Sequence, residues 1–168
     1  AKADRGIALP NPEKLELSDE VSALFEFYEA VAEDLGIELT AEGHGQVFGD
    51  RLMIRRAISN LLSNALRHAE RNTKVTVAVM TRESEVTLSV SNKGTSIGRE
   101  HLSRLFDRFY RVDKARTRPE SDGAGLGLAI TSAIMQAHHG RIDVVSEAER
   151  TTFSLHFPSP ALDANHEQ

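Results

Sequence analysis

The chain contains no cysteine and no tryptophan, and only 5% of its 168 residues are aromatic. The absence of cysteine excludes disulfide bonds, thiolate metal ligands and a cysteine nucleophile, and it fits a cytoplasmic setting. No stretch approaches the roughly 18 consecutive apolar residues of a membrane-spanning helix, and no signal peptide pattern opens the chain. The 20 Lys and Arg are outnumbered by 25 Asp and Glu, so the formal net charge is −5. This balance argues against a general nucleic-acid binder, which neutralises phosphates with Lys and Arg.

A composition of 40% hydrophobic and 27% charged residues is typical of a globular protein. A chain of this length forms about one domain and buries roughly two-thirds of its unfolded surface. The first residue is Ala1 rather than Met. We therefore expect a piece of a longer protein, whose membrane parts would lie outside this sequence.

Three long segments show helical periodicity. Ser18 is expected to be the N-cap of a first helix that ends at Gly36, and Asp50 the N-cap of a second helix over 51–69. A third helix is expected over about 124–139, and a short one near 100–106.

Alternating or short apolar runs predict strands, which are 37–41, 46–49, 75–80, 86–90, 141–146 and 151–157. Most of these runs are spaced as hairpins. Three main helices and this set of strands predict an α+β fold. It is a two-layer sandwich in which the helices cover one face of a mixed, mostly antiparallel sheet.

The domain boundaries follow from local composition. Residues 1–17 carry Pro10 and Pro12 in a polar run and are predicted to be a linker, so the domain proper covers 18–158. A long segment of about 98–122 has little periodicity, which in compact domains is typical of functional or mobile loops. The polar tail 159–168 is predicted to be disordered.

A polar stripe follows one face of the predicted helix 51–69. Its members, at i, i+4, i+7 and i+8, are Asn60, Asn64, Arg67 and His68. A solvated face is the ordinary interpretation, but such faces favour Lys, Glu and Gln, whereas each Asn costs about 0.5 kcal/mol relative to Ala. Side-chain oxygens one turn apart suit a hard cation such as Mg²⁺. Arg67, one turn further, suits phosphate oxygens.

Three glycines, Gly123, Gly125 and Gly127, open the third predicted helix. Glycine lets the backbone approach a ligand, and the free N–H groups of a helix N-terminus attract phosphate. A flexible hinge is the alternative interpretation. The spacing is neither the dinucleotide fingerprint nor a Walker A loop, and protein-kinase signatures are missing. What remains is a phosphate cradle of another design.

Two further segments are weak signals when each is taken alone. Asn92-Lys-Gly94-Thr-Ser96-Ile97 follows the strand 86–90 and could be an ordinary turn. Leu105-Phe-Asp-Arg-Phe-Tyr-Arg111 concentrates three aromatic residues and could be a hydrophobic plug that fixes the long loop to the core.

In order and spacing, these four segments resemble the N, G1, F and G2 boxes of the catalytic, ATP-binding domain of bacterial sensor histidine kinases. The resemblance covers about residues 18–158 and implies the Bergerat ATP-binding fold shared with gyrase, Hsp90 and MutL. The Asn-x-Gly-Thr-x-Ile variant at 92–97 and the run Leu-Phe-Asp-Arg-Phe-Tyr-Arg-Val-Asp are similar to the heavy-metal (copper or silver) sensing group of these kinases.

The resemblance implies a role for each residue of the polar stripe. Asn64 would ligate Mg²⁺, and Asn60 would support the metal or the phosphates. Arg67 would contact and position the phosphates, and His68 would lie beside the ribose or a phosphate. No other residue of this chain would take a catalytic part.

The remaining boxes would bind the rest of the nucleotide. By the resemblance, Asn92, Gly94 and Ile97 would form the adenine site, and Phe106 and Phe109 would anchor the ATP lid. Phe109 and Tyr110 would also contact the nucleotide, and Arg111 would lie at the phosphate side of the lid. The start of the third helix would receive the triphosphate with Gly123, Gly125, Leu126, Gly127 and Leu128.

The sequence departs from the family pattern at two positions. Asn92 replaces the usual Asp that accepts a hydrogen bond from the adenine amino group, and an amide oxygen accepts without the strength of a charge. Ser96 replaces the second glycine of the box. Asn60 stands where ATP-hydrolysing relatives of the fold carry a Glu, and an amide cannot act as a general base for water.

The resemblance therefore implies an enzyme: the catalytic domain of an ATP-dependent protein-histidine kinase. It would bind Mg·ATP and donate the γ-phosphate to a histidine on the dimerisation domain of the parent homodimer, for relay to an Asp of a response regulator. None of the seven histidines here has the phosphoacceptor context, so the chain alone should not autophosphorylate. We expect a cytoplasmic domain of a parent anchored in the bacterial inner membrane, with no nucleic acid partner and no membrane contact of its own.

Two alternatives belong to other classes. One is a protein-serine kinase of the anti-sigma type on the same fold, a group that usually has a shorter lid and lacks the Phe-box run. The other is a nucleotide-sensing or docking module without catalysis, in which Asn92 and Ser96 mark a degenerate site.

Overall fold

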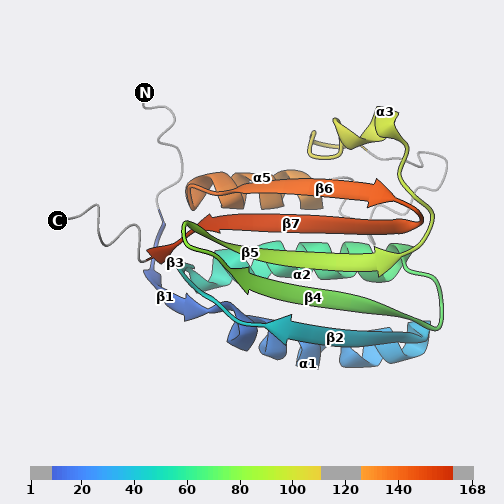
Figure 1. Cartoon of the computed structure of the whole chain (residues 1–168), viewed down its shortest axis with the longest axis horizontal. Helices are drawn as coiled ribbons and strands as arrows, with labels where there is room; N and C mark the ends of the chain where they lie inside the picture. The colour runs from blue at the N-terminus through green and yellow to red at the C-terminus, as the bar shows by residue number, and fades with distance from the viewer. Residues whose placement is uncertain (1–8, 111–125, 161–168) are drawn as a thin grey trace.

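The computed structural model describes residues 9–110 and 126–160, and it forms two layers, a sheet and a layer of helices behind it (Figure 1). The first half contains β1 (Pro12–Glu16), α1 (Leu17–Leu35), β2 (Ile37–Gly43), β3 (Gln46–Asp50), α2 (Arg51–His68) and β4 (Thr73–Thr81). The second half contains β5 (Glu85–Lys93), α3 (Arg99–Leu102), α5 (Gly127–Ala137), β6 (Arg141–Glu147) and β7 (Arg150–Pro158). The predicted α+β sandwich is confirmed.

The main sheet has five strands in the order β2-β4-β5-β7-β6. Only the β2–β4 pair is parallel, and the other three pairs are antiparallel. Helices α1, α2 and α5 lie together on one face of this sheet in Figure 1. On β5, side chains alternate between buried and half-buried from Glu85 to Asn92, because successive residues face the helices and the open face in turn. Asn92 belongs to the helix-facing set.

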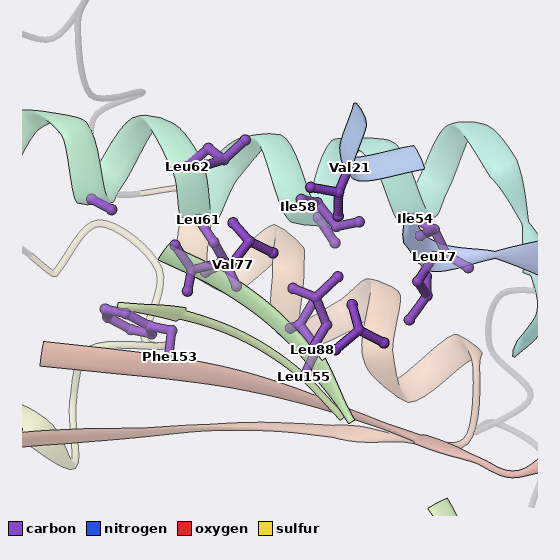
Figure 2. Close-up of a cluster of buried hydrophobic side chains, with 14 of the residues drawn as sticks. Leu17, Val21, Ile54, Ile58, Leu61, Leu62, Val77, Leu88, Phe153 and Leu155 are labelled. Carbon is purple, nitrogen blue, oxygen red and sulfur yellow. The ribbon is translucent and has the colours of Figure 1, made fainter. Parts of the chain in front are cut away.

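The core lies between the helices and the sheet (Figure 2). Leu61 of α2, Leu88 of β5 and Leu155 of β7 are fully buried and come from elements far apart in the sequence. Leu17 and Val21 extend this cluster to the start of α1. Burial of this apolar face holds α2 in a fixed position over the sheet, which in turn fixes its polar stripe.

Two of three predicted helix caps are confirmed, and the third is corrected. The Met53 N–H donates to Asp50 Oδ1 at 3.0 Å at the start of α2, as predicted. Gly36 ends α1 with a left-handed φ of 71°, also as predicted. At the start of α1, however, the N-cap is Glu16 rather than Ser18, and the Ser18 N–H donates to its carboxylate at 3.3 Å.

The structure corrects the predicted linker 1–17 in its last part. Residues 12–16 form β1, which pairs antiparallel with β3, and Leu15 is 1% exposed. Its neighbour Leu17 belongs to α1 and is likewise buried. The strand was missed because only one of its five residues is apolar. Its conformation depends on pairing with a distant segment rather than on its own pattern.

Strand pairing also differs from the expected hairpins. Although β2 and β3 are separated by two residues, β2 pairs with β4 and β3 pairs with β1. Gly43 has φ 82°, and a Cβ there would lie 1.9 Å from the Val79 carbonyl oxygen. Because only glycine allows this contact, β2 stays close against β4 to its last residue, and the chain then continues into β3 without forming a β2–β3 hairpin.

His138 directly follows the last residue of α5. The structure buries it at 3% exposure and gives it two hydrogen bonds. The Asp50 N–H donates to Nε2 at 3.1 Å, and the ring bonds the Ile134 carbonyl through Nδ1 at 2.8 Å. Through these two bonds the ring ties the end of α5 to the start of α2.

Within the part of the chain that the structure describes, no helix is long and apolar enough to cross a membrane. The predicted segment 98–122 is described only to residue 110, and the predicted tail 159–168 only to residue 160.

Candidate functional site

The side chain of Asn60 joins α2 to the first turn of α5. Its Nδ2 donates to the Gly127 carbonyl oxygen at 3.0 Å and to Thr131 Oγ1 at 3.1 Å. Because a carbonyl oxygen only accepts, the nitrogen of the amide must face α5. The opposite atom, Oδ1, has no hydrogen-bond partner in residues 9–110 and 126–160 and is therefore available to a cation or another donor.

Asn64 and Arg67 contact each other one turn further along α2. Arg67 Nη2 donates to Asn64 Oδ1 at 3.2 Å, and the pair is exposed to solvent. The oxygen predicted to ligate a metal is thus held by the side chain predicted to bind phosphate. A bound Mg·phosphate group would compete for both, because it supplies a cation for the oxygen and an anion for the guanidinium.

His68 ends α2 beside this pair. Desolvation against the surrounding chain, together with the positive charge of Arg67, lowers the pKa of His68 below its usual value. The imidazole is therefore neutral at pH 7 and can accept a hydrogen bond from a hydroxyl. A sugar hydroxyl is a suitable partner for such a group.

Asn92, near the end of β5, is 4% exposed and faces the helix layer. No hydrogen bond to its side-chain amide occurs within the described ranges 9–110 and 126–160. A buried amide without a partner costs free energy, on the order of 1–3 kcal/mol, unless a ligand or water satisfies it. Its neighbours Val75 and Thr151 face it across the strand pairs.

Gly94 brings the end of β5 against the end of α2. A Cβ at this position would lie 2.4 Å from the His68 carbonyl oxygen, so only glycine fits. The same junction is closed by the Glu70 N–H, which donates to the Lys93 carbonyl at 2.9 Å. The close approach places Asn92 directly beside the end of the polar stripe.

Ile97 is half-buried and packs against the core, and its N–H donates to Ser146 Oγ at 2.8 Å. Ser146 in turn bonds Thr151, with 2.7 Å between the two hydroxyl oxygens. Ser146 and Thr151 were missed in the sequence, because isolated hydroxyls in strands carry no motif. Their place beside Asn92 depends on the β6–β7 and β5–β7 register, which only the fold supplies.

The start of α5 completes the site in part. Leu126, Gly127 and Leu128 are half-buried, and Gly127 is held by Asn60. The predicted residues Arg111, Gly123 and Gly125 lie outside the described residues.

The aromatic segment after α3 divides into two parts. Leu105 is buried, and Phe106 packs edge-on against Phe153 of β7, with ring centroids 6.3 Å apart. Phe109, predicted to anchor the lid with Phe106, is instead 62% exposed and has a φ of 66°. Tyr110 contacts its own segment: its hydroxyl bonds His101, and Arg104 lies 4.6 Å from its ring centroid.

The structure thus gathers Asn60, Asn64, Arg67, His68, Asn92, Gly94 and Gly127 around the junction of α2, the end of β5 and the start of α5 (Figure 1). The set offers oxygen ligands, a cation, a neutral imidazole and a buried amide. This donor set fits a nucleotide with a divalent cation.

The family described as "Histidine kinase-, DNA gyrase B-, and HSP90-like ATPase" matches residues 49–161. The chain is 48% identical over 160 residues to the sensor histidine kinase CusS of Escherichia coli (strain K12), covering 95% of this chain and 33% of that protein. It is 42% identical over 165 residues to the probable sensor kinase SilS of Salmonella typhimurium, covering 94% and 33%. The chain spans about one third of the length of these relatives.

Solved structures are similar in fold. The catalytic domain of the histidine kinase ThkA in a nucleotide-free form has a TM-score of 0.78 at 23% identity, covering 89% of this chain and 96% of that one. ThkA in complex with the response regulator TrrA has a TM-score of 0.74 at 21% identity, covering 88% and 42%. Full-length ShkA in complex with AMPPNP has a TM-score of 0.77 at 24% identity, covering 90% and 32%.

Proposed function

The chain belongs to the family of histidine kinase-, DNA gyrase B- and HSP90-like ATPases, and from this membership we propose that it is the ATP-binding catalytic domain of a two-component sensor histidine kinase. It binds Mg·ATP at the junction of α2, β5 and α5. In the parent homodimer it donates the γ-phosphate to a histidine of the dimerisation domain, and a response-regulator Asp then receives the phosphate.

The observation that carries the proposal is the buried amide of Asn92 beside Gly94, which has no hydrogen-bond partner among residues 9–110 and 126–160. An adenine edge presents an amino donor and a ring acceptor, and a carboxamide offers one acceptor and one donor in return. The ShkA complex with AMPPNP supports this reading, since a similar fold binds an ATP analogue there.

The phosphates are assigned to α2 and the start of α5. Arg67 contacts phosphate oxygens, and Asn64 and Asn60 supply oxygen atoms to Mg²⁺, which neutralises phosphate charge when it is bound. Asn60 Oδ1 is the best prepared of these atoms, because both donors on its nitrogen are fixed by α5.

The chain holds ATP without activating water. Asn60 is a carboxamide, so it takes no proton from an attacking water molecule. The γ-phosphorus is then attacked by the imidazole nitrogen of the partner histidine, the bond to the bridging oxygen breaks, and ADP leaves. Positioning and charge neutralisation are what this reaction requires of the protein.

The partners and the location follow from the parent architecture. The chain works with its own dimerisation domain and with a response regulator, as the kinase ThkA does with TrrA. It lies in the cytoplasm, in a parent anchored in the inner membrane. Its similarity to CusS and SilS supports a place in the heavy-metal-sensing group.

Calorimetric titration with ATP or ADP, with and without Mg²⁺, tests the nucleotide site. We expect micromolar-range binding that weakens about ten- to a hundredfold in Asn64→Ala or without Mg²⁺, the size expected for a lost charge-assisted contact. Lys74→Ala, an exposed cation on β4 that faces away from the helix layer because its neighbour Val75 is buried, is the matched control and should bind as wild type does.

Phosphotransfer is tested by adding a dimerisation domain to the chain with γ-labelled ATP. Label should appear on the added domain and not on the chain alone. The absence of nucleotide binding under any condition would refute the proposal and favour a docking module. Label on a serine of another protein would favour the serine-kinase alternative.

A further inference from the structure

The β6–β7 hairpin turns through two residues in a backbone conformation that they seldom adopt. Ala148 has φ 53° and Glu149 has φ 59°, and the flanking residues Glu147 and Arg150 pair with each other. Two-residue hairpin loops with positive φ at both positions are typically Asn-Gly, because these residues tolerate the left-handed region. Ala and Glu do not favour it, so the surroundings must hold the turn.

Three hydrogen bonds join this hairpin to the loop 94–97, which follows β5. The Gly94 N–H donates to the Glu149 carbonyl at 3.0 Å, and the Glu149 N–H donates to Ser96 Oγ at 2.8 Å. The Ile97 N–H donates to Ser146 Oγ at 2.8 Å. The loop and the turn therefore fix each other from both directions.

Of these three bonds, only the one to Ser96 requires a particular side chain in the loop 94–97. The other two bonds involve the loop only through backbone N–H groups. A glycine, which stands here in the family pattern, has no side-chain oxygen to accept from Glu149. The bond between Ser96 and Glu149 thus depends on a residue that departs from the family pattern.

We propose that Ser96 is a positioning residue for the nucleotide base: its hydroxyl fixes the loop 94–97 to the strained β6–β7 turn and so presents Gly94 and Ile97 to the adenine. The inference rests on the proposed function, because it assigns this loop to the base. The Asn92 amide then meets an adenine whose plane is already confined by a preformed loop.

The first test compares Ser96→Ala with Ser96→Thr, which keeps the hydroxyl. Amide hydrogen exchange of Glu149 without nucleotide reports the bond itself, and calorimetry with Mg·ADP reports binding. In Ser96→Ala the amide hydrogen of Glu149 should exchange faster, and Mg·ADP should bind about two- to tenfold more weakly. This loss of affinity corresponds to the net free energy of one hydrogen bond. Ser96→Thr should restore both values, and Ser22→Ala, which removes an exposed serine hydroxyl on α1, is the matched control.

The second test supplies the turn with residues that favour its conformation. Ala148→Asn with Glu149→Gly should make the turn stable without help from the loop. Combined with Ser96→Ala, this pair should then recover most of the lost affinity, so that the effects are not additive. A merely local packing role of Ser96 would not be rescued in this way.

Unchanged Glu149 exchange in Ser96→Ala would overturn the proposal, and so would faster exchange with unchanged Mg·ADP affinity. Failure of the wild-type chain to bind Mg·ADP is a different result. It would refute the nucleotide site itself, and the positioning role with it, even if the exchange of Glu149 still depended on the Ser96 hydroxyl.

Discussion

At the scale of single residues, the two amides Asn60 and Asn92 differ in how the fold uses them. Asn60 has its nitrogen engaged by α5 and its oxygen open, which suits a cation. Asn92 is buried with neither atom engaged by a described residue, which suits a ligand with both a donor and an acceptor. The same residue type therefore serves two chemistries, decided by the neighbours.

Asn92→Asp is predicted to change stability and binding in opposite directions. A carboxylate accepts from the adenine amino group more strongly than an amide, so Mg·ATP should bind about five- to tenfold more tightly. Without nucleotide, the buried charge has no partner among the described residues, so the midpoint of thermal unfolding should fall.

Calorimetry and thermal unfolding of the same sample measure both effects. Asn92→Ala is the control, and it should bind more weakly than wild type. Equal or weaker ATP binding by Asn92→Asp would mean that this side chain does not contact the adenine.

Sequence motifs could predict which residues of α2 share a face and which residues end β5, because helical spacing and strand ends are local patterns. Ser146 and Thr151 could not be found in this way. They join the site through the register between β5, β7 and β6, and β5 and β7 are separated by more than fifty residues of chain. Such long-range register follows from core packing rather than from local pattern.

At the scale of elements, Asp50 couples the start of α2 to the N-terminal segment. The Met53 N–H at 3.0 Å and the Asn11 N–H at 3.1 Å both donate to its carboxylate. The bond from Met53 is the main cause that lowers the pKa of Asp50, against the opposing effect of burial, and Asn11 adds to it. The ionised carboxylate is thus the form that the folded state prefers.

This preference predicts an acid dependence of stability. Because the folded-state pKa lies below the unfolded value near 3.8, the stabilisation is complete above that value and is lost as the pH falls through the folded pKa. Asp50→Asn keeps an acceptor but not the charge. It should cost about 0.3–1 kcal/mol near neutral pH, the size of the interaction between one charge and the helix dipole.

Urea unfolding between about pH 6 and about pH 2 measures this difference. The gap between wild type and Asp50→Asn should shrink as the pH falls. A gap that stays constant over this range would mean that the charge of Asp50 contributes nothing to the cap.

The α3 segment is predicted to be anchored by Phe106 and not by Phe109. Phe106 packs on Phe153, so Phe106→Ala should lower the free energy of unfolding by about 1–3 kcal/mol. Phe109→Ala removes a ring that is 62% exposed and should change it by less than about 0.5 kcal/mol. Denaturant unfolding of both variants measures these free energies. Equal decreases in the two variants would contradict the prediction that Phe106 is the anchor.

At the scale of the whole molecule, β1 makes the residues before α1 part of the domain. It pairs with β3, and Leu15 and Val47 from the two strands are both buried. Glu16 adds a further connection, because the Gly45 N–H donates to its carboxylate at 2.7 Å. A boundary drawn at residue 18 would therefore remove contacts that hold β3 and the cap of α2.

Leu15→Ala is predicted to destabilise the whole domain. The side chain is 1% exposed, so its truncation should cost about 2–5 kcal/mol. Lys14→Ala, one position earlier and exposed, should stay within about 0.5 kcal/mol of wild type. Thermal unfolding of the two variants tests this, and similar midpoints would show that β1 adds nothing to the fold.

Helix α2 fixes both described ends of the segment that lies between β5 and α5. Near one end, the Glu70 N–H just after the helix binds the Lys93 carbonyl, and at the other, Asn60 binds Gly127. The cost of closing a chain between two fixed points grows slowly, by about 0.6 kcal/mol for each doubling of its length. A change of length between these anchors should therefore cost little through chain closure itself, and its effect on stability should depend on whether it disturbs the packing of Leu105 and Phe106.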